Sequence, residues 1–135
     1  QDYVETKVAE WATKATELGN ANVQTALAHT YFNGTGVRQD RKKAAELLAK
    51  AAQLGDAQAY AHLAWMYLQG EGVPQDKAKA AKWMTKAAQQ GYAEAQSLLA
   101  KMYLEGDGVA QDKSKAAEWM TNAAKPPWRA LVART

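Results

Sequence analysis

Two histidines are the first candidates for chemistry in this chain. His29 and His62 are its only imidazoles, and an imidazole serves as a general acid, a general base or a metal ligand near neutral pH. Neither has a nucleophile or a second metal ligand at a fixed local spacing, so a surface or contact role is favoured. The chain has no cysteine, which excludes disulfides and the common cysteine-rich zinc sites. The sequence therefore predicts no catalytic residue and no metal site.

Three aspartates recur at equal intervals and suggest either carboxylate chemistry or helix capping. Asp40, Asp76 and Asp112 lie 36 residues apart, each just before a stretch of helix-forming residues. Their spacing does not match a calcium-binding EF-hand loop. An aspartate in this place accepts hydrogen bonds from the free amides of the following helix. Helix capping is therefore the predicted role.

Each of these aspartates ends a short segment with two glycines, which invites a phosphate-binding interpretation. The segments are Gly34-Thr-Gly36-Val37-Arg-Gln39-Asp40, Gly70-Glu-Gly72-Val73-Pro-Gln75-Asp76 and Gly106-Asp-Gly108-Val109-Ala-Gln111-Asp112. They lack the third glycine and the preceding strand of a dinucleotide fold, and no Gly-Lys-Ser/Thr follows. Backbone geometry accounts for both glycines, so no cofactor is predicted.

The composition indicates an all-α protein. Helix-forming residues dominate, and runs of β-branched or aromatic residues are absent. The 17 basic and 14 acidic residues are interspersed, which is typical of a solvated helical surface. One basic cluster comprises Arg38, Arg41, Lys42 and Lys43. It occurs once and has no interleaved aromatic residues, so nucleic-acid binding is not predicted.

The ends and apolar runs of the chain bear on its location. No apolar run reaches the ~18 to 20 residues that a membrane span needs. Residues 1–10 lack the apolar region of a signal peptide. We expect no membrane span and no signal peptide in the chain as given, and its location stays open.

The glycine segments belong to a repeat of 36 residues. Each unit is predicted to hold a first helix, helix A, and a second helix, helix B, with glycine ending helix A. The A helices are expected over 21–33, 57–69 and 93–105, and the B helices over 3–18, 41–54, 77–90 and 113–124. Trp11, Trp83 and Trp119 recur on B helices and are predicted to lie in the core.

The predicted domain is a single solenoid over residues 1–125. It comprises a leading half-repeat, 1–20, and three repeats, 21–56, 57–92 and 93–125. Pro126-Pro127 then breaks the register, because proline has no amide and crowds the residue before it. Residues 126–135 are interpreted as a C-terminal cap or an appended tail.

The repeated residues resemble the Sel-one-like repeat family, which is related to the tetratricopeptide repeat. In the middle unit they are Ala57, Ala59, Leu63, Ala64, Tyr67, Gly70-x-Gly72-Val73, Asp76, Ala80, Trp83, Lys86-Ala87-Ala88 and Gly91. The resemblance implies a right-handed α/α solenoid of antiparallel helix pairs whose A helices line the concave side. It also implies a non-enzymatic protein-interaction scaffold. An exported or periplasmic bacterial location is compatible with it.

Comparison of the three units separates positions needed for stacking from positions free to bind. The positions identical in every unit are assigned to stacking: Ala21/Ala57/Ala93, Leu27/Leu63/Leu99, Ala28/Ala64/Ala100 and Tyr31/Tyr67/Tyr103. Four varying positions of helix A share one stripe, because they are spaced i, i+4, i+7, i+11. They are predicted to line a groove for a protein or peptide: Asn22, Ala26, His29, Asn33, Gln58, His62, Trp65, Gln69, Glu94, Leu98, Lys101 and Glu105. An ordinary solvated face is the alternative, although an exposed tryptophan is typical of an interface.

Other interpretations stay open. The chain is alternatively a small-molecule-binding or enzyme-associated module built around His62, or a fragment of a longer repeat array. Self-association through the terminal helices is also expected, because an uncovered apolar stripe at either end of an array promotes association. These stripes are Val4, Val8, Trp11 and Ala15 at one end, and Trp128, Leu131 and Val132 at the other.

Overall fold

A computed structural model describes residues 2–124, and residue 1 and residues 125–135 lie outside the description. The described part forms seven α-helices and no strand. The helices are α1 Asp2–Leu18, α2 Ala21–Asn33, α3 Arg41–Gln53, α4 Ala57–Gln69, α5 Lys77–Gln89, α6 Ala93–Glu105 and α7 Lys113–Ala124. This confirms the all-α prediction, with helix ends displaced by a residue at most. The segment interpreted as a cap or tail, 126–135, is outside the described residues. Within them, no helix is both long and apolar enough to span a bilayer.

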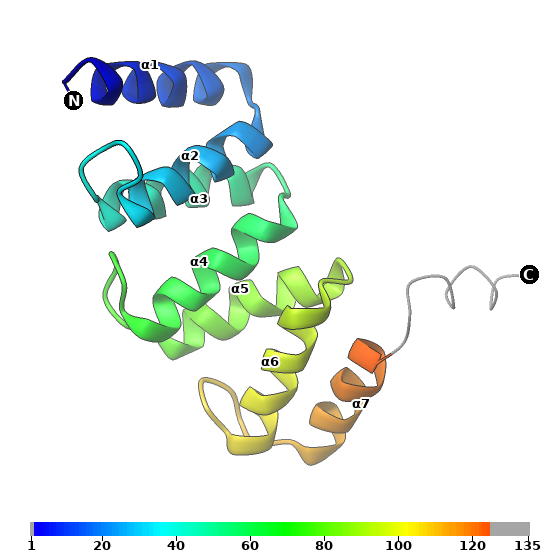
Figure 1. Ribbon diagram of the computed structural model, residues 1–135. Helices are drawn as coiled ribbons and strands as arrows, with labels where there is room; N and C mark the ends of the chain where they lie inside the picture. The colour runs from blue at the N-terminus through cyan, green and yellow to red at the C-terminus, as the bar shows by residue number, and fades with distance from the viewer. Residues whose placement is uncertain (1, 125–135) are drawn as a thin grey trace, which may run out of the picture.

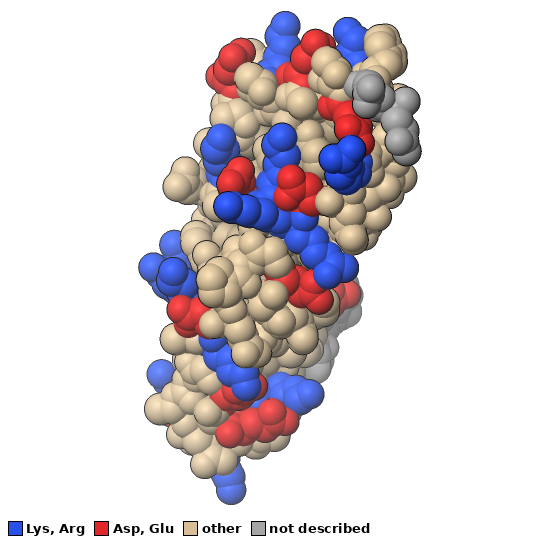
Figure 2. Space-filling view, turned by 90° about the vertical axis from the view of Figure 1, so that its left-hand side faces the viewer, with Lys and Arg blue, Asp and Glu red and all other residues tan. Residues whose placement is uncertain are grey.

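The helices form a solenoid of three antiparallel pairs, α2 with α3, α4 with α5 and α6 with α7, and α1 precedes them (Figure 1). Each helix packs on the next one in the chain. The A helices α2, α4 and α6 therefore follow one another along one side of the stack. The three glycine loops lie along the left edge in Figure 1, and the turns between repeats lie along the opposite edge. Basic and acidic side chains interleave down the loop edge (Figure 2).

The glycine loops have the same internal bonds in every repeat. Gly70 ends α4 in the left-handed conformation, with φ of 72°. The Asp76 amide donates to the Tyr67 carbonyl at 2.9 Å, and the Gln75 side-chain amide donates to the Leu68 carbonyl at 2.9 Å. The Asp76 carboxylate then accepts from the Lys79 amide and caps α5. Asp40 and Asp112 do the same for α3 and α7, so the capping role is confirmed.

In the second and third loops, the second glycine lies against the first residue of the B helix in the preceding repeat. Gly72 has φ of 79°, and a Cβ atom placed there would overlap the carbonyl group of Arg41, the first residue of α3. Gly108 has the same relation to the carbonyl of Lys77, the first residue of α5. Only a residue without a side chain allows this approach, so the loop contact sets the distance between repeats.

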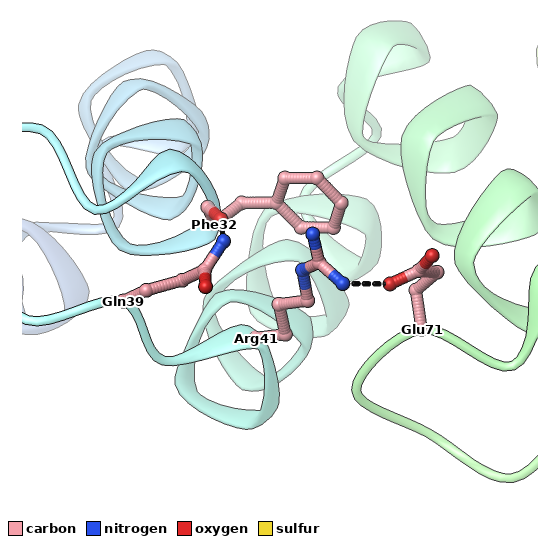
Figure 3. A network of polar contacts seen from close by, with 4 residues as sticks. All are labelled: Phe32, Gln39, Arg41 and Glu71. Carbon is pink, nitrogen blue, oxygen red and sulfur yellow. Dashed lines mark hydrogen bonds and ion pairs between the residues drawn. The ribbon is translucent and has the colours of Figure 1, made fainter.

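An ion pair stands beside each of these glycine contacts. Arg41 of α3 reaches across to Glu71 in the following loop, and its guanidinium lies 4.8 Å from the Phe32 ring centroid (Figure 3). One repeat later, Lys77 pairs with Asp107 at 2.9 Å. The junction between α1 and the first repeat differs, because Glu5 there accepts a hydrogen bond from the Arg38 amide instead. The loop edge therefore joins each repeat to the one before it.

Only some of the positions that are identical in all three repeats are buried in the core. The alanines at 28, 64 and 100 are fully buried, and the leucines at 27, 63 and 99 are at most 8% exposed. Ala93, by contrast, is exposed at the start of α6, so its assignment to stacking was wrong. The prediction of a core Trp11 was also wrong, since its side chain is 56% exposed. The corresponding Trp83 is half-buried against Tyr60 of α4, and within residues 2–124 no A helix precedes α1 to provide such a partner.

We expect substitution of the second glycine to separate backbone strain from inter-repeat contact. Gly36→Ala should lower the free energy of unfolding by about 1 kcal/mol, because alanine is strained at positive φ and its Cβ meets only Val4 at 3.8 Å. Gly72→Ala at almost the same φ should lower it by roughly 1 to 3 kcal/mol more, because the Arg41 carbonyl must move. Urea titrations of both variants measure the difference. Equal losses would contradict a role for Gly72 in spacing the repeats.

The two tryptophans on B helices offer a second comparison. Trp83→Ala should destabilise the chain by about 2 to 3 kcal/mol, because it removes a half-buried ring stacked on Tyr60. Trp11→Ala should change stability by less than about 1 kcal/mol, because most of that side chain is in water. Thermal or denaturant melts provide the measurement. A larger loss at Trp11 would mean that α1 is covered in solution, for instance by self-association.

Candidate protein-binding groove

The twelve residues predicted to line the groove all reach the surface. Nine are exposed, three are half-buried, and none belongs to the buried core. The half-buried ones are His29, His62 and Leu98. They come from α2, α4 and α6, which lie in succession along the stack. We call this surface the A-helix face.

A pocket of about 360 Å³ opens on the A-helix face between the second and third repeats. Six of the twelve predicted residues line it: His29, Gln58, His62, Trp65, Glu94 and Leu98. The Trp65 ring forms part of the wall and stays 41% exposed, although an indole gains free energy by burial. The pocket thus combines apolar walls with a few polar groups, as binding sites usually do.

A second hollow of about 310 Å³ adjoins the pocket. Leu98 lines both, and Gln69, Lys101 and Glu105 belong to the second one only. The remaining predicted residues, Asn22, Ala26 and Asn33, line neither of these two hollows. The structure therefore brings nine of the twelve residues to two neighbouring depressions and leaves three on the flank of α2.

The pocket lies at the repeat junction that lacks an inter-repeat hydrogen bond present at the junction before it. At the junction of the first and second repeats, the buried Thr25 hydroxyl donates to the Asp56 carboxylate at 2.6 Å. The corresponding residues at the next junction are Ala61 and Tyr92, and both line the pocket. Alanine is smaller than threonine and has no hydroxyl, so this contact cannot form there. Ala61 and Tyr92 instead form part of the pocket lining between α4 and α6.

Tyr92 is the residue that sequence reasoning missed. The N-cap position before each A helix holds Asn20, Asp56 and Tyr92, and only the first two accept a hydrogen bond there with their side chains. Asparagine and aspartate are good caps, and tyrosine is not. A break in an otherwise regular capping pattern was the available indication. Ala61, Met84 and Ala95 also line the pocket, and no pattern in the sequence singled them out.

The two histidines meet across the junction between the first and second repeats. Their rings stack with centroids 4.5 Å apart, and the Phe32 ring contacts His62 edge-on at 5.0 Å. Burial, together with repulsion from His29, lowers the pKa of His62 from 6.5 to about 4. His62 is therefore neutral near pH 7. Within residues 2–124, no group of three or more His, Cys, Asp or Glu side chains could hold a metal ion.

The basic cluster contributes to the fold. Arg41 is paired with Glu71, and the Lys43 ammonium lies 5.3 Å from the Tyr31 ring centroid. Lys79 over Tyr67 and Lys115 over Tyr103 repeat this cation–π contact at 5.5 and 5.4 Å. These contacts join the end of each A helix to the start of its B helix.

Comparison with known proteins agrees with this geometry. The Sel1 repeat model matches residues 21–56, 57–92 and 93–125. A Sel1 repeat protein from Oxalobacter formigenes is 32% identical with a TM-score of 0.76, and the match covers 91% of this chain and 95% of that one. No curated protein sequence matches the chain.

Two further solved structures share the fold. One is a protective antigen of uropathogenic Escherichia coli strains, 40% identical with a TM-score of 0.80 over 86% of this chain. The present chain spans only 25% of that antigen's length. The other is cysteine-rich protein B of Helicobacter pylori, 22% identical with a TM-score of 0.66, covering 87% of this chain and 84% of that one. At that identity the likeness concerns the fold alone.

Sel1 repeats generally mediate protein interactions, and proteins built from them are typically non-enzymatic scaffolds. The family model covers the three helix pairs in phase, and the loops, caps and buried alanines recur in each of them. The chain belongs to the Sel1 repeat family.

Proposed function

We propose that this chain is a non-enzymatic interaction module that binds a segment of a partner protein along its A-helix face. An apolar side chain of the partner fills the pocket between α4 and α6, and the rest of the segment crosses the neighbouring A helices. The observation that carries this proposal is the pocket itself. It gathers residues from three repeats, and six of them, including the half-exposed Trp65, are at positions that vary among the A helices.

The distribution of charge supports this choice of surface. Helices α2 and α4 contain no Lys, Arg, Asp or Glu, whereas α3 carries five such residues and α5 carries four. Covering an uncharged surface requires little desolvation of ions, so a partner is accommodated more easily on α2 and α4 than on α3 and α5. Asparagine and glutamine side chains on this face both donate and accept hydrogen bonds, which suits a peptide backbone.

The alternative is a small-molecule site in the same pocket. Its volume of about 360 Å³ lies within the range of roughly 300 to 1,000 Å³ that is usual for such sites. A small molecule would be confined to the pocket, whereas a peptide would also depend on residues outside it. Lys101 and Gln69, which line only the second hollow, distinguish the two cases.

Replacement of Trp65 should weaken binding without unfolding the chain. Peptides of about twelve residues are selected by display from a random library, because that length crosses three A helices at ~3.3 Å per residue. Trp65→Ala should weaken the selected peptides by about 2 kcal/mol or more, roughly thirtyfold. The melting temperature should change little, because the repeats carry His29 and Lys101 at the same position.

Trp11→Ala is the matched control, since it removes the exposed tryptophan of α1 away from the pocket. It should leave peptide affinity unchanged. Full retention of binding by Trp65→Ala, or a large loss of its stability, would refute the groove assignment. Selected peptides that are insensitive to changes at Lys101 and Gln69 would favour the small-molecule alternative.

The lowered pKa of His62 makes the free energy of unfolding depend on pH. Its pKa of about 4 in the folded chain lies below the unfolded value of 6.5, so the unfolded state binds the proton more readily. Stability is therefore unaffected by His62 above pH 6.5, falls as the pH drops towards 4, and changes no further below that. The gap between the two pKa values corresponds to roughly 3 kcal/mol, and because the His62 ring is only partly buried, solvent screening reduces the expected loss to on the order of 2 kcal/mol.

Comparison with His62→Leu isolates this effect from the titration of carboxylates. Leucine occupies the same position in the third repeat, as Leu98, so the variant should fold. The difference in unfolding free energy between the two proteins should be constant above pH 6.5 and should shift in favour of the leucine variant as the pH falls. Denaturant melts between pH 4 and 8 measure it, and a difference independent of pH would contradict the burial of a neutral His62.

A further inference from the structure

The A-helix face changes character along the solenoid. The first and last varying positions carry carboxamides in α2 and α4, namely Asn22 with Asn33 and Gln58 with Gln69. In α6 the same two positions carry carboxylates, Glu94 and Glu105. Charge on this face therefore enters only at the third repeat. The face holds one lysine against two glutamates, on a chain whose formal charge is +3.

Glu94 is the single carboxylate in the lining of the pocket. The rest of the lining holds no Lys, Arg or Asp, and burial lowers the pKa of His62, so this ring is neutral near pH 7. No ion pair of Glu94 occurs within residues 2–124. Lys101, the lysine of the A-helix face, lines the second hollow and not the pocket. The pocket therefore presents one unpaired negative charge beside an apolar wall.

An occupant of the pocket would change the surroundings of this carboxylate. Filling the space beside Trp65 removes water from Glu94 as well, and a carboxylate that loses water without gaining a partner is strongly destabilised. An acidic occupant would add repulsion. A cationic group next to the apolar anchor would offset the lost hydration and provide a charge-assisted hydrogen bond.

We propose that the partner segment carries a bulky apolar residue with a lysine or arginine close to it in sequence, and that the basic side chain pairs with Glu94. The inference rests on the proposed function and names the chemistry of the partner at the same groove. It assigns the pocket between α4 and α6 to an apolar and cationic pair of side chains. Acidic segments are excluded from the pocket.

Glu94 also has a structural effect that the test must separate from binding. It lies in the first turn of α6, whose N-cap Tyr92 makes no side-chain hydrogen bond. A carboxylate there interacts favourably with the helix dipole. This interaction with the helix dipole affects the stability of α6 to the same extent whichever peptide is bound. A preference between two peptides reports only on binding.

The repeat itself provides matched variants. Glu94→Gln installs the residue that the second repeat has at this position, Gln58, and Glu105→Gln installs the counterpart of Gln69. Both variants remove one carboxylate from α6 and should fold. They differ in location, because Glu105 lines the second hollow with Lys101.

The experiment selects random peptides by display on the wild-type chain and compares synthetic pairs in which the basic residue is kept or replaced by glutamate. Selected sequences should combine a bulky apolar residue with Lys or Arg close to it in sequence, so that both side chains of the extended peptide reach the pocket. The basic peptide should bind the wild type about fivefold more tightly than its acidic counterpart. This ratio should approach one in Glu94→Gln, persist in Glu105→Gln and shrink at high salt.

The outcomes distinguish this inference from the function on which it rests. Peptides that require Trp65 but show no basic preference, or a preference that Glu94→Gln leaves unchanged, would overturn the pairing with Glu94 and keep the groove. Peptides whose affinity is indifferent to Trp65→Ala would overturn both. A preference lost equally in Glu94→Gln and Glu105→Gln would show general attraction to α6 and would also overturn the assignment to the pocket.

Discussion

The approach of the second and third glycine loops to the B helix of the preceding repeat is the contact on which the rest of the solenoid depends. Gly72 and Gly108 lie so close to the first carbonyls of α3 and α5 that no side chain fits between them. Pairing of Arg41 with Glu71, and of Lys77 with Asp107, holds the same edge. Because the loop is also bonded to the end of its own A helix, this contact places α2, α4 and α6 in succession. The A-helix face follows from that arrangement.

Departures from the repeat support the proposed binding surface, since a position that differs among units is not required by stacking. A threonine–aspartate hydrogen bond joins the first junction through Thr25 and Asp56, whereas Ala61 and Tyr92 at the second junction cannot form it and line the pocket. The weaker capping of α6 by Tyr92 agrees with the common finding that binding sites depart from locally optimal structure. A repeat protein can thereby vary its binding surface while the buried alanines and loop glycines stay the same.

The A helices and the B helices of the first two repeats differ in how many charged residues they carry. The B helices carry most of the lysines, several of which lie over tyrosine rings of the preceding A helix. The A helices stay nearly uncharged until α6, where Glu94 stands at the pocket. The B helices thus carry most of the charge and the cation–π contacts, and the proposed binding surface lies on the A helices. The longer Escherichia coli antigen, of which this chain spans 25%, shows that such repeats also occur within larger proteins.

Helix boundaries, caps and the stripe of varying residues could all be predicted from the sequence, because each depends on residues close together in the chain. Gly70 and Asp76 delimit their helices through local backbone geometry and capping bonds. The burial of Trp11 and Trp83 could not be predicted, because the same residue on the same kind of helix is exposed or half-buried according to the helix that packs beside it. Nor could the pocket, which requires residues about 30 apart to meet across a junction. The tertiary structure alone decided these features, since burial and cavity shape depend on packing between repeats.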